Sequence, residues 1–266
     1  MTAPRALEAD RATPPSLAEH PPLSVARRLA RALRVSVHAL AGLATTTLVF
    51  PLSGADRRRM LIQRWSVKLL ALLNVDCRVQ GRLSRDAGNV LVVANHISWL
   101  DIVVLNAVCP VRFVAKADIA RWPVAGSLAR AGGTLFIERA RRRDTHRIAR
   151  SVTDALRAGD IVAVFPEGTT SHGESTLPFK SSLLQAIVDA AGEMLPLAIR
   201  YRDPRGGRSS AAAYVGDDSF MTSFWRVCAT RALVVEVMPL ARVPAAGRHR
   251  RALAKEAEAA IRRVLE

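Results

Sequence analysis

Beyond residue 75 the chain alternates between short apolar runs rich in β-branched residues and longer amphipathic stretches. This alternation is typical of an α/β fold, in which helices flank a largely parallel central sheet. The predicted strands are residues 90–94, 112–115, 134–137, 161–165, 194–201, 211–215 and 233–238. The predicted helices are residues 100–108, 143–158, 179–190, 220–229 and 248–265. No linker divides residues 75–266, so we expect one domain there.

The segment before this domain divides into two parts. Residues 1–22 contain five prolines and little apolar periodicity, which is typical of a flexible tail. Within residues 23–74, an uncharged stretch at 35–52 is barely long enough to span a bilayer. Residues 57–73 place Leu61, Trp65 and Leu69 on one helical face, opposite polar residues that include Arg59, Gln63 and Ser66. We expect a two-helix hairpin that lies in one membrane leaflet; the alternative is that both helices simply pack on the domain that follows.

The charge of the chain indicates a polyanionic partner. The formal net charge is +16, and arginines flank the uncharged stretch on both sides. The positive-inside rule then favours the cytoplasmic face of the inner membrane, with an anionic membrane surface as the partner. Aromatic residues make up 5% of the chain, which argues against nucleic-acid binding by base stacking. Three scattered cysteines predict neither a disulfide framework nor a zinc site, and they favour a reducing compartment.

The stretch VLVVANHISWLDI at residues 90–102 carries the first candidate site. A strand ends just before His96, and a helix is expected to begin at Ser98, which has capping-box spacing to Asp101. Asp101 would then lie in the first helical turn, close enough to orient the imidazole of His96 as a general base. The structural alternative is a hydrogen-bonded histidine at a strand end beside an ordinary first-turn acid.

Two further stretches end predicted strands in polar residues. In IVAVFPEGTTS, at residues 161–171, the turn Pro166-Glu167-Gly168-Thr169 offers backbone N–H groups to an anion or a polar substrate. In GGTLFIER, at residues 132–139, the strand runs into Arg139, whose guanidinium can bind a phosphate or carboxylate in bidentate fashion. For the arginines at 141–143 that follow, a solvated helix start is the expected role.

Together these stretches resemble the glycerolipid acyltransferases, the family of 1-acylglycerol-3-phosphate and related lysophospholipid acyltransferases. The blocks NHISWLD (95–101), GGTLFIER (132–139), FPEGTTS (165–171) and LPLAIRY (195–201) occur in the family's order and approximate spacing. Four blocks in this order and spacing identify the family specifically, although each block alone is a weak signal. The hairpin also resembles the family's membrane-docking helices.

The resemblance implies transfer of an acyl group from acyl-CoA or acyl-carrier protein to the hydroxyl of a lysolipid. It gives His96 and Asp101, the HX4D pair, the roles of general base and orienting acid. It places Arg139, Glu167 and Gly168, with the adjoining Thr169, at the acceptor site. The donor is a co-substrate, and neither a metal nor another cofactor is expected.

At one position the sequence departs from the family pattern in a way that affects the predicted acceptor. Phosphatidate-forming members of the family commonly carry arginine where this chain has Thr170, so a possible phosphate ligand is lost. The stretches FVAKADIARWP and LPFKSSL are similar to those of lyso-ornithine-lipid acyltransferases. The expected acceptor is therefore 1-acylglycerol-3-phosphate or a lyso-aminolipid.

Two other functions remain open on the residues alone. One is a basic peripheral lipid-binding protein without catalytic activity, which the net charge allows. The other is a lipid or thioester hydrolase, but the sequence has no G-x-S-x-G elbow to supply a nucleophile.

Overall fold

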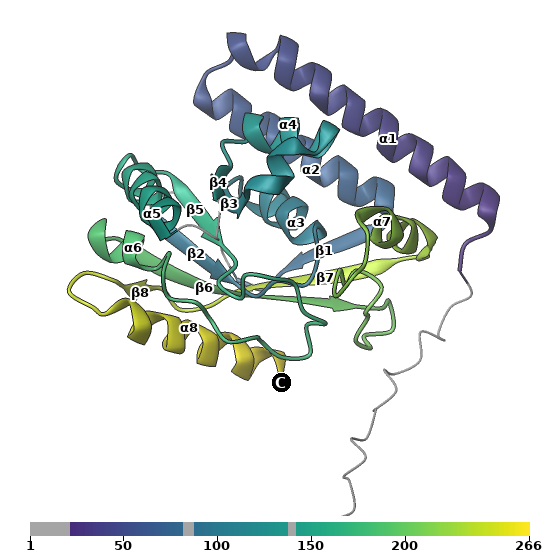
Figure 1. Cartoon of the computed structure of the whole chain (residues 1–266). Helices are drawn as coiled ribbons and strands as arrows, with labels where there is room; N and C mark the ends of the chain where they lie inside the picture. Colours follow the sequence, from purple (N-terminus) through teal and green to yellow (C-terminus); the bar gives the residue numbers. More distant parts are fainter. Residues whose placement is uncertain (1–21, 82–87, 138–141) are drawn as a thin grey trace, which may run out of the picture.

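An eight-stranded sheet forms the centre of the protein (Figure 1), whose computed structural model describes residues 22–81, 88–137 and 142–266. The strands are β1 (Val75–Val79), β2 (Val90–Ala94), β3 (Arg112–Lys116), β4 (Leu135–Ile137), β5 (Ile161–Val164), β6 (Glu193–Arg202), β7 (Leu233–Pro239) and β8 (Val243–Pro244). Their order is β1-β7-β6-β2-β5-β3-β4, and β8 pairs with β6. The pairings of β6 with β7 and with β8 are antiparallel, and the others are parallel. The predicted largely parallel sheet is confirmed.

Helices cover both faces of this sheet. They are α1 (Val25–Leu48), α2 (Ala55–Leu73), α3 (Leu100–Val108), α4 (Pro123–Ala131), α5 (Arg142–Arg157), α6 (Gln185–Asp189), α7 (Phe220–Ala229) and α8 (Arg250–Leu265), with short 3-10 helices η1 (Phe50–Leu52) and η2 (Ala117–Arg121). In Figure 1, α1 to α4 and α7 lie above the sheet and α8 lies below it. Alternate residues of β2 pack into two separate cores, Val92 against α2, α3 and α7 and Leu91 against α5, α6 and α8.

Two predicted elements differ from the structure. Residues 211–215 form a loop rather than a strand, because their backbone groups bond to other loops: the N–H of Tyr214 donates to the carbonyl of Ile97 at 2.9 Å. The helix predicted at 179–190 is reduced to α6, because the N–H of Phe179 donates to the carboxylate of Glu258 at 2.8 Å and that of Lys180 to the Pro166 carbonyl. β1, β8 and α4 have no counterpart among the predicted strands and helices.

The N-terminal segment forms two helices that pack on each other and on the rest of the protein. The rings of His38 on α1 and Trp65 on α2 stack with their centroids 5.1 Å apart. The predicted polar face of α2 is wrong in part, because Gln63 donates to two carbonyls at the end of α3 and Ser66 is buried. In the described part of the chain, no helix combines the length and apolar character needed to cross a bilayer. The predicted tail lies outside the described residues, apart from Pro22.

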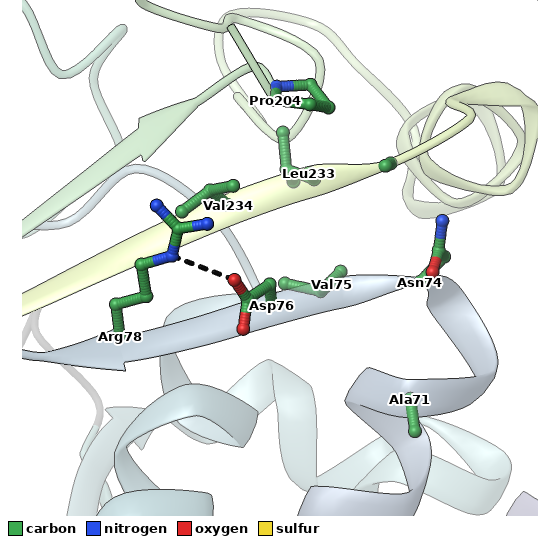
Figure 2. A pocket seen from close by; sticks show the side chains of 9 residues that line it. Ala71, Asn74, Val75, Asp76, Arg78, Pro204, Leu233 and Val234 are labelled. Atoms are coloured by element: carbon green, nitrogen blue, oxygen red, sulfur yellow. Dashed lines mark hydrogen bonds and ion pairs between the residues drawn. The ribbon is translucent and has the colours of Figure 1, made fainter. Parts of the chain in front are cut away.

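A shallow pocket lies at the β1 edge of the sheet (Figure 2). Asp76 and Arg78 of β1 form an ion pair there, and Val234 of β7 and Pro204 also line the pocket. None of the residues that line this pocket belongs to the predicted site.

Candidate active site

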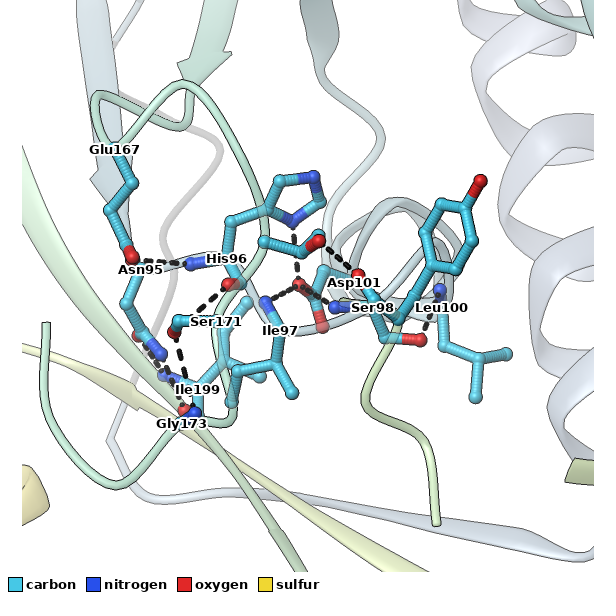
Figure 3. A network of polar contacts seen from close by, with 12 residues as sticks. Asn95, His96, Ile97, Ser98, Leu100, Asp101, Glu167, Ser171, Gly173 and Ile199 are labelled. Carbon is cyan, nitrogen blue, oxygen red and sulfur yellow. Dashed lines mark hydrogen bonds and ion pairs between the residues drawn. The ribbon is translucent and has the colours of Figure 1, made fainter. Parts of the chain in front are cut away.

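The two main motifs meet where neighbouring parallel strands end. β2 pairs with β5, so the loops that follow the two strands lie at the same edge of the sheet. The backbone N–H of His96 donates to Oε1 of Glu167 at 2.8 Å, and the N–H of Ser171 donates to the carbonyl of His96 at 2.8 Å. Residues about 70 positions apart in the sequence therefore form a single site (Figure 3).

His96 is held on two sides. Its Nδ1 lies 2.8 Å from Oδ2 of Asp101, and since a carboxylate can only accept, Nδ1 carries the proton. One face of the imidazole stacks on the ring of Phe165, with centroids 3.9 Å apart. Within the described residues Nε2 makes no hydrogen bond, and the side chain is 19% exposed. The free nitrogen is thus positioned to accept a proton from a bound hydroxyl.

Asp101 is fully buried, and its carboxylate receives four hydrogen bonds. Oδ2 accepts from the backbone N–H groups of Ile97 at 2.7 Å and Ser98 at 2.9 Å, in addition to His96 (Figure 3). Oδ1 accepts from the hydroxyl of Tyr201 at 2.7 Å. These donors compensate the cost of burying the carboxylate.

The predicted capping box is only half present. Asp101 does reach back to the N–H of Ser98, but the hydroxyl of Ser98 accepts from Leu100 at 3.2 Å rather than from Asp101. The helix begins at Leu100, the first residue of the predicted range 100–108, and not at Ser98, where the capping-box spacing had placed its start. The side-chain contact expected between His96 and Asp101 is present; their catalytic roles remain predictions.

Glu167 directs its carboxylate at backbone rather than at open solvent. It is 3% exposed, and it accepts from the N–H groups of His96 and, at 3.2 Å, of Leu177. Burial raises the pKa of Glu167, while the two N–H groups act in the opposite direction. This geometry ties the Glu167 loop to His96; contact with the acceptor stays a prediction.

Of the remaining predicted residues, Gly168 and Thr169 continue the loop that carries Glu167. Gly168 has a φ of +78°, and its N–H donates to the Phe165 carbonyl at 3.1 Å, which closes the turn. Thr169 is exposed. The hydroxyl of Thr170 donates to the carbonyl of Tyr214. Arg139, with the neighbouring residues 138 and 141, lies outside the described residues, and the side chains of Arg142 and Arg143 are not described either.

No role was predicted for two buried polar residues of the site. The side-chain amide of Asn95 forms a pair of hydrogen bonds with the backbone of Ile199, at 2.9 and 2.8 Å, and so ties the end of β2 to β6. Tyr201 bonds Asp101, as described above. Its signal in the sequence was its place as the polar member of the alternating series Leu195, Leu197, Ile199, Tyr201. In the described parts of the chain, no group of three or more His, Cys, Asp or Glu side chains is suited to hold a metal ion.

Known proteins share both the sequence pattern and the fold. Residues 76–200 match the family model described as Acyltransferase. The chain is 40% identical over 168 residues to a 1-acyl-sn-glycerol-3-phosphate acyltransferase of Neisseria gonorrhoeae, a match that spans 63% of this chain and 66% of that relative. It is 36% identical over 241 residues to a lyso-ornithine lipid O-acyltransferase of Pseudomonas aeruginosa, covering 90% of this chain and 92% of the relative.

A solved structure has the same fold. The 1-acyl-sn-glycerophosphate (LPA) acyltransferase PlsC from Thermotoga maritima superposes with a TM-score of 0.63 at 22% identity, over 88% of this chain and 96% of that one. The sequence resemblance to acyltransferases is thereby confirmed, and the chain belongs to the glycerolipid acyltransferase family of O-acyltransferases.

Proposed function

We propose that this O-acyltransferase moves a fatty acyl group from an acyl thioester to the free hydroxyl of a lysolipid, with His96 as the general base. The observation that carries this proposal is the state of the imidazole. Nδ1 is fixed by a buried carboxylate, whereas Nε2 is unbonded within the described residues and partly exposed. That is the arrangement needed to take a proton from a substrate hydroxyl.

The reaction proceeds in two proton transfers. Nε2 of His96 removes the hydroxyl proton as the acceptor oxygen attacks the thioester carbonyl. The carbonyl oxygen becomes an oxyanion, which the backbone N–H groups of Glu167 and Thr169, in the turn at residues 166–169, stabilise. Collapse of the tetrahedral intermediate forms the ester, breaks the C–S bond, and returns the proton from His96 to the departing thiolate.

Asp101 contributes through the imidazole. While Nδ1 donates to Oδ2, the proton cannot reside on Nε2 of the neutral ring, so the base is always in the reactive tautomer. The carboxylate also stabilises the imidazolium that forms during the attack. Neither step calls for a metal or another cofactor, and the donor is acyl-CoA or acyl-carrier protein.

For the acceptor, we favour a lyso-aminolipid of the ornithine-lipid type over 1-acylglycerol-3-phosphate. The relative that acts on lyso-ornithine lipid aligns over 92% of its length, against 66% for the relative named for the glycerol phosphate. Thr170 supplies no positive charge, and its hydroxyl is already bonded to the Tyr214 carbonyl. Arg139 remains the proposed ligand for an anionic group of the acceptor.

We further propose that the protein works at the cytoplasmic face of the inner membrane, with α1 against the lipid. Val25, Leu29, Leu33, Val37 and Leu40 lie on successive turns of α1, and each is more than half exposed. An exposed apolar stripe beside arginines is the pattern of a helix that binds an anionic membrane surface.

A direct assay tests the proposal. The purified chain would be incubated with a labelled long-chain acyl-CoA and vesicles that contain either lyso-ornithine lipid or 1-acylglycerol-3-phosphate. We expect a diacyl product by mass spectrometry, with the higher kcat/KM for lyso-ornithine lipid. Vesicle binding without any transfer, from acyl-CoA or from acyl-carrier protein, would instead support the non-catalytic lipid-binding function.

A further inference from the structure

Tyr201 reaches the active site because β6 is longer than its neighbour. The last residue of β2, Ala94, pairs with Leu197, and β6 continues to Arg202. This extension runs beside the loop that carries His96. Leu195, Leu197, Ile199 and Tyr201 alternate along β6 and pack into the same core as α3. The period of two therefore directs the last of them at the first turn of α3, where Asp101 lies.

The contact of Tyr201 with Asp101 is short and shielded from water. The two oxygens are 2.7 Å apart, Tyr201 is 3% exposed and Asp101 is fully buried. Burial, and then the charge of Asp101, raises the pKa of Tyr201 well above its usual value of 10. The phenol therefore stays protonated and donates its hydrogen to Oδ1.

We propose that Tyr201 is a positioning residue that acts through Asp101, holding Oδ1 so that Oδ2 faces the Nδ1–H of His96. This inference rests on the proposed function, in which His96 is the base. Tyr201 itself touches neither substrate in this proposal, and its effect on the reaction passes entirely through the carboxylate.

The distribution of donors over the two carboxylate oxygens supports this role. Oδ2 accepts from Ile97, Ser98 and His96, whereas among the described residues the partner of Oδ1 is Tyr201. Without the phenol, a buried anionic oxygen has no donor, which is a costly state. The carboxylate then relieves that state by rotating toward other donors, and the rotation moves Oδ2 away from the Nδ1–H of His96.

The first test is Tyr201→Phe, which keeps the ring and removes only the hydroxyl. With lyso-ornithine lipid and a long-chain acyl-CoA, we expect kcat to fall by about 10-fold or more, as for the loss of a hydrogen bond to a charged group. The KM values for both substrates should stay unchanged. Tyr201 replaced by 4-aminophenylalanine retains a donor in the same place and should recover most of the lost kcat.

A double-mutant cycle separates positioning from packing. If Tyr201 acts through Asp101, then Tyr201→Phe has little further effect on kcat once Asp101→Asn has been made. A merely structural role would lower kcat by the same factor in both backgrounds. Val235→Ala is the matched control, because Val235 is the fully buried cross-strand partner of Tyr201 on β7. It should lower the melting temperature and leave kcat unchanged.

Three results would overturn the inference: normal kcat in a folded Tyr201→Phe enzyme, no recovery with 4-aminophenylalanine, or full additivity with Asp101→Asn. If Tyr201→Phe does not fold, the 4-aminophenylalanine variant still tests the inference, because we expect the 4-aminophenylalanine variant to fold and to be active. Failure of the wild-type chain to acylate either acceptor would instead overturn the proposed function, and this inference with it.

Discussion

The imidazole of His96 stacks on the ring of Phe165, with the two planes within 10° of each other. Phe165 opens the turn after β5, whereas His96 follows β2, so each motif fixes the other's geometry. With Nδ1 bonded to Asp101, the ring has a set plane and a set rotation. Catalysis by such a base depends on this orientation as well as on its proton affinity.

Loss of His96, the proposed base, should severely impair acyl transfer without loss of the fold. His96→Ala is expected to lower kcat by roughly 10²- to 10⁴-fold, the usual contribution of a general base. Asp101→Asn should also lower kcat severely, because the amide no longer fixes the tautomer. Activity with a labelled acyl-CoA and circular dichroism would be measured together, with His249→Ala, an exposed histidine at the start of α8, as the control. Substantial activity in folded His96→Ala would refute the mechanism.

Glu167 should make the stability of the protein depend on pH in a predictable direction. Burial raises the pKa of Glu167 above its ordinary value of 4.5, so the folded state holds this proton more tightly than the unfolded state. Its contribution to stability is therefore lost as pH rises from about its ordinary pKa through the folded-state pKa. Glu167→Gln has no such proton. The free energy of unfolding of the variant, relative to wild type, should increase with pH across that window in urea titrations; parallel curves would contradict the assignment.

Thr170 offers a test of acceptor choice. Thr170→Arg places a guanidinium at the position where the family resemblance implies a phosphate ligand, and it removes the bond to the Tyr214 carbonyl. We expect a larger ratio of kcat/KM for 1-acylglycerol-3-phosphate over lyso-ornithine lipid, because arginine can bind a phosphate in bidentate fashion. Thr170→Gln, which is long but uncharged, is the control. An unchanged ratio would mean that this position does not select the headgroup.

The exposed stripe of α1 should determine membrane binding. Replacement of Leu29, Leu33 and Val37 by serine removes apolar side chains that are 54 to 66% exposed. We expect affinity for vesicles that contain phosphatidylglycerol to fall by at least about 10-fold, given the free energy of burying such side chains. Sedimentation with vesicles measures this, and Val79→Ser, an exposed valine on β1, serves as the control. Equal binding by all variants would exclude α1 as the docking surface.

Membrane binding by the N-terminal helices is better tested by substitution than by their removal. Leu69, Leu70 and Leu73 of α2 are buried in the core shared with α3 and β2. Removal of residues 1–74 should therefore leave an insoluble chain, since it exposes this core.

The cysteines should be nearly inert in the native protein. Burial raises the pKa of both Cys77 and Cys228 to about 11, so thiolate is scarce at neutral pH, and Cys109 is buried. We expect slow reaction with a disulfide reagent such as DTNB at pH 7.5 and three reactive thiols in denaturant. Fast labelling of the folded protein would contradict this prediction. Slow labelling would allow the same reagent to be used to follow the release of CoA during acyl transfer.

Sequence patterns were sufficient for the elements with strong apolar periodicity. The strand before His96 and the helices 100–108 and 220–229 have the predicted bounds. β1 was not predicted because it is a short edge strand that contains the charged residues Asp76 and Arg78. The strand predicted at 211–215 was wrong because the backbone partners of these residues come from distant loops. Local patterns do not encode such partners.

The candidate site likewise combines contacts that local sequence predicts with contacts that it does not. The spacing of His96 and Asp101 lies within one strand-to-helix junction, so their contact follows from local geometry. The direction of the Glu167 carboxylate and the bond from Tyr201 depend on strand order and register, since the residues are 71 and 100 positions from their partners. The sequence alone does not specify this strand order and register, so neither the Glu167 contact nor the Tyr201 contact could be predicted from it.

The long reach of these contacts has a consequence for the order of folding. His96 and Asp101 are synthesised early, but the distant groups that fix them follow in the turn after β5 and on β6. Closure of such long loops is slow, and it precedes any stabilisation by the contacts. A nascent chain that ends before β6 thus lacks both the Asn95–Ile199 clamp and the phenol on Asp101. The ability to transfer an acyl group should therefore be acquired only after most of the domain has left the ribosome.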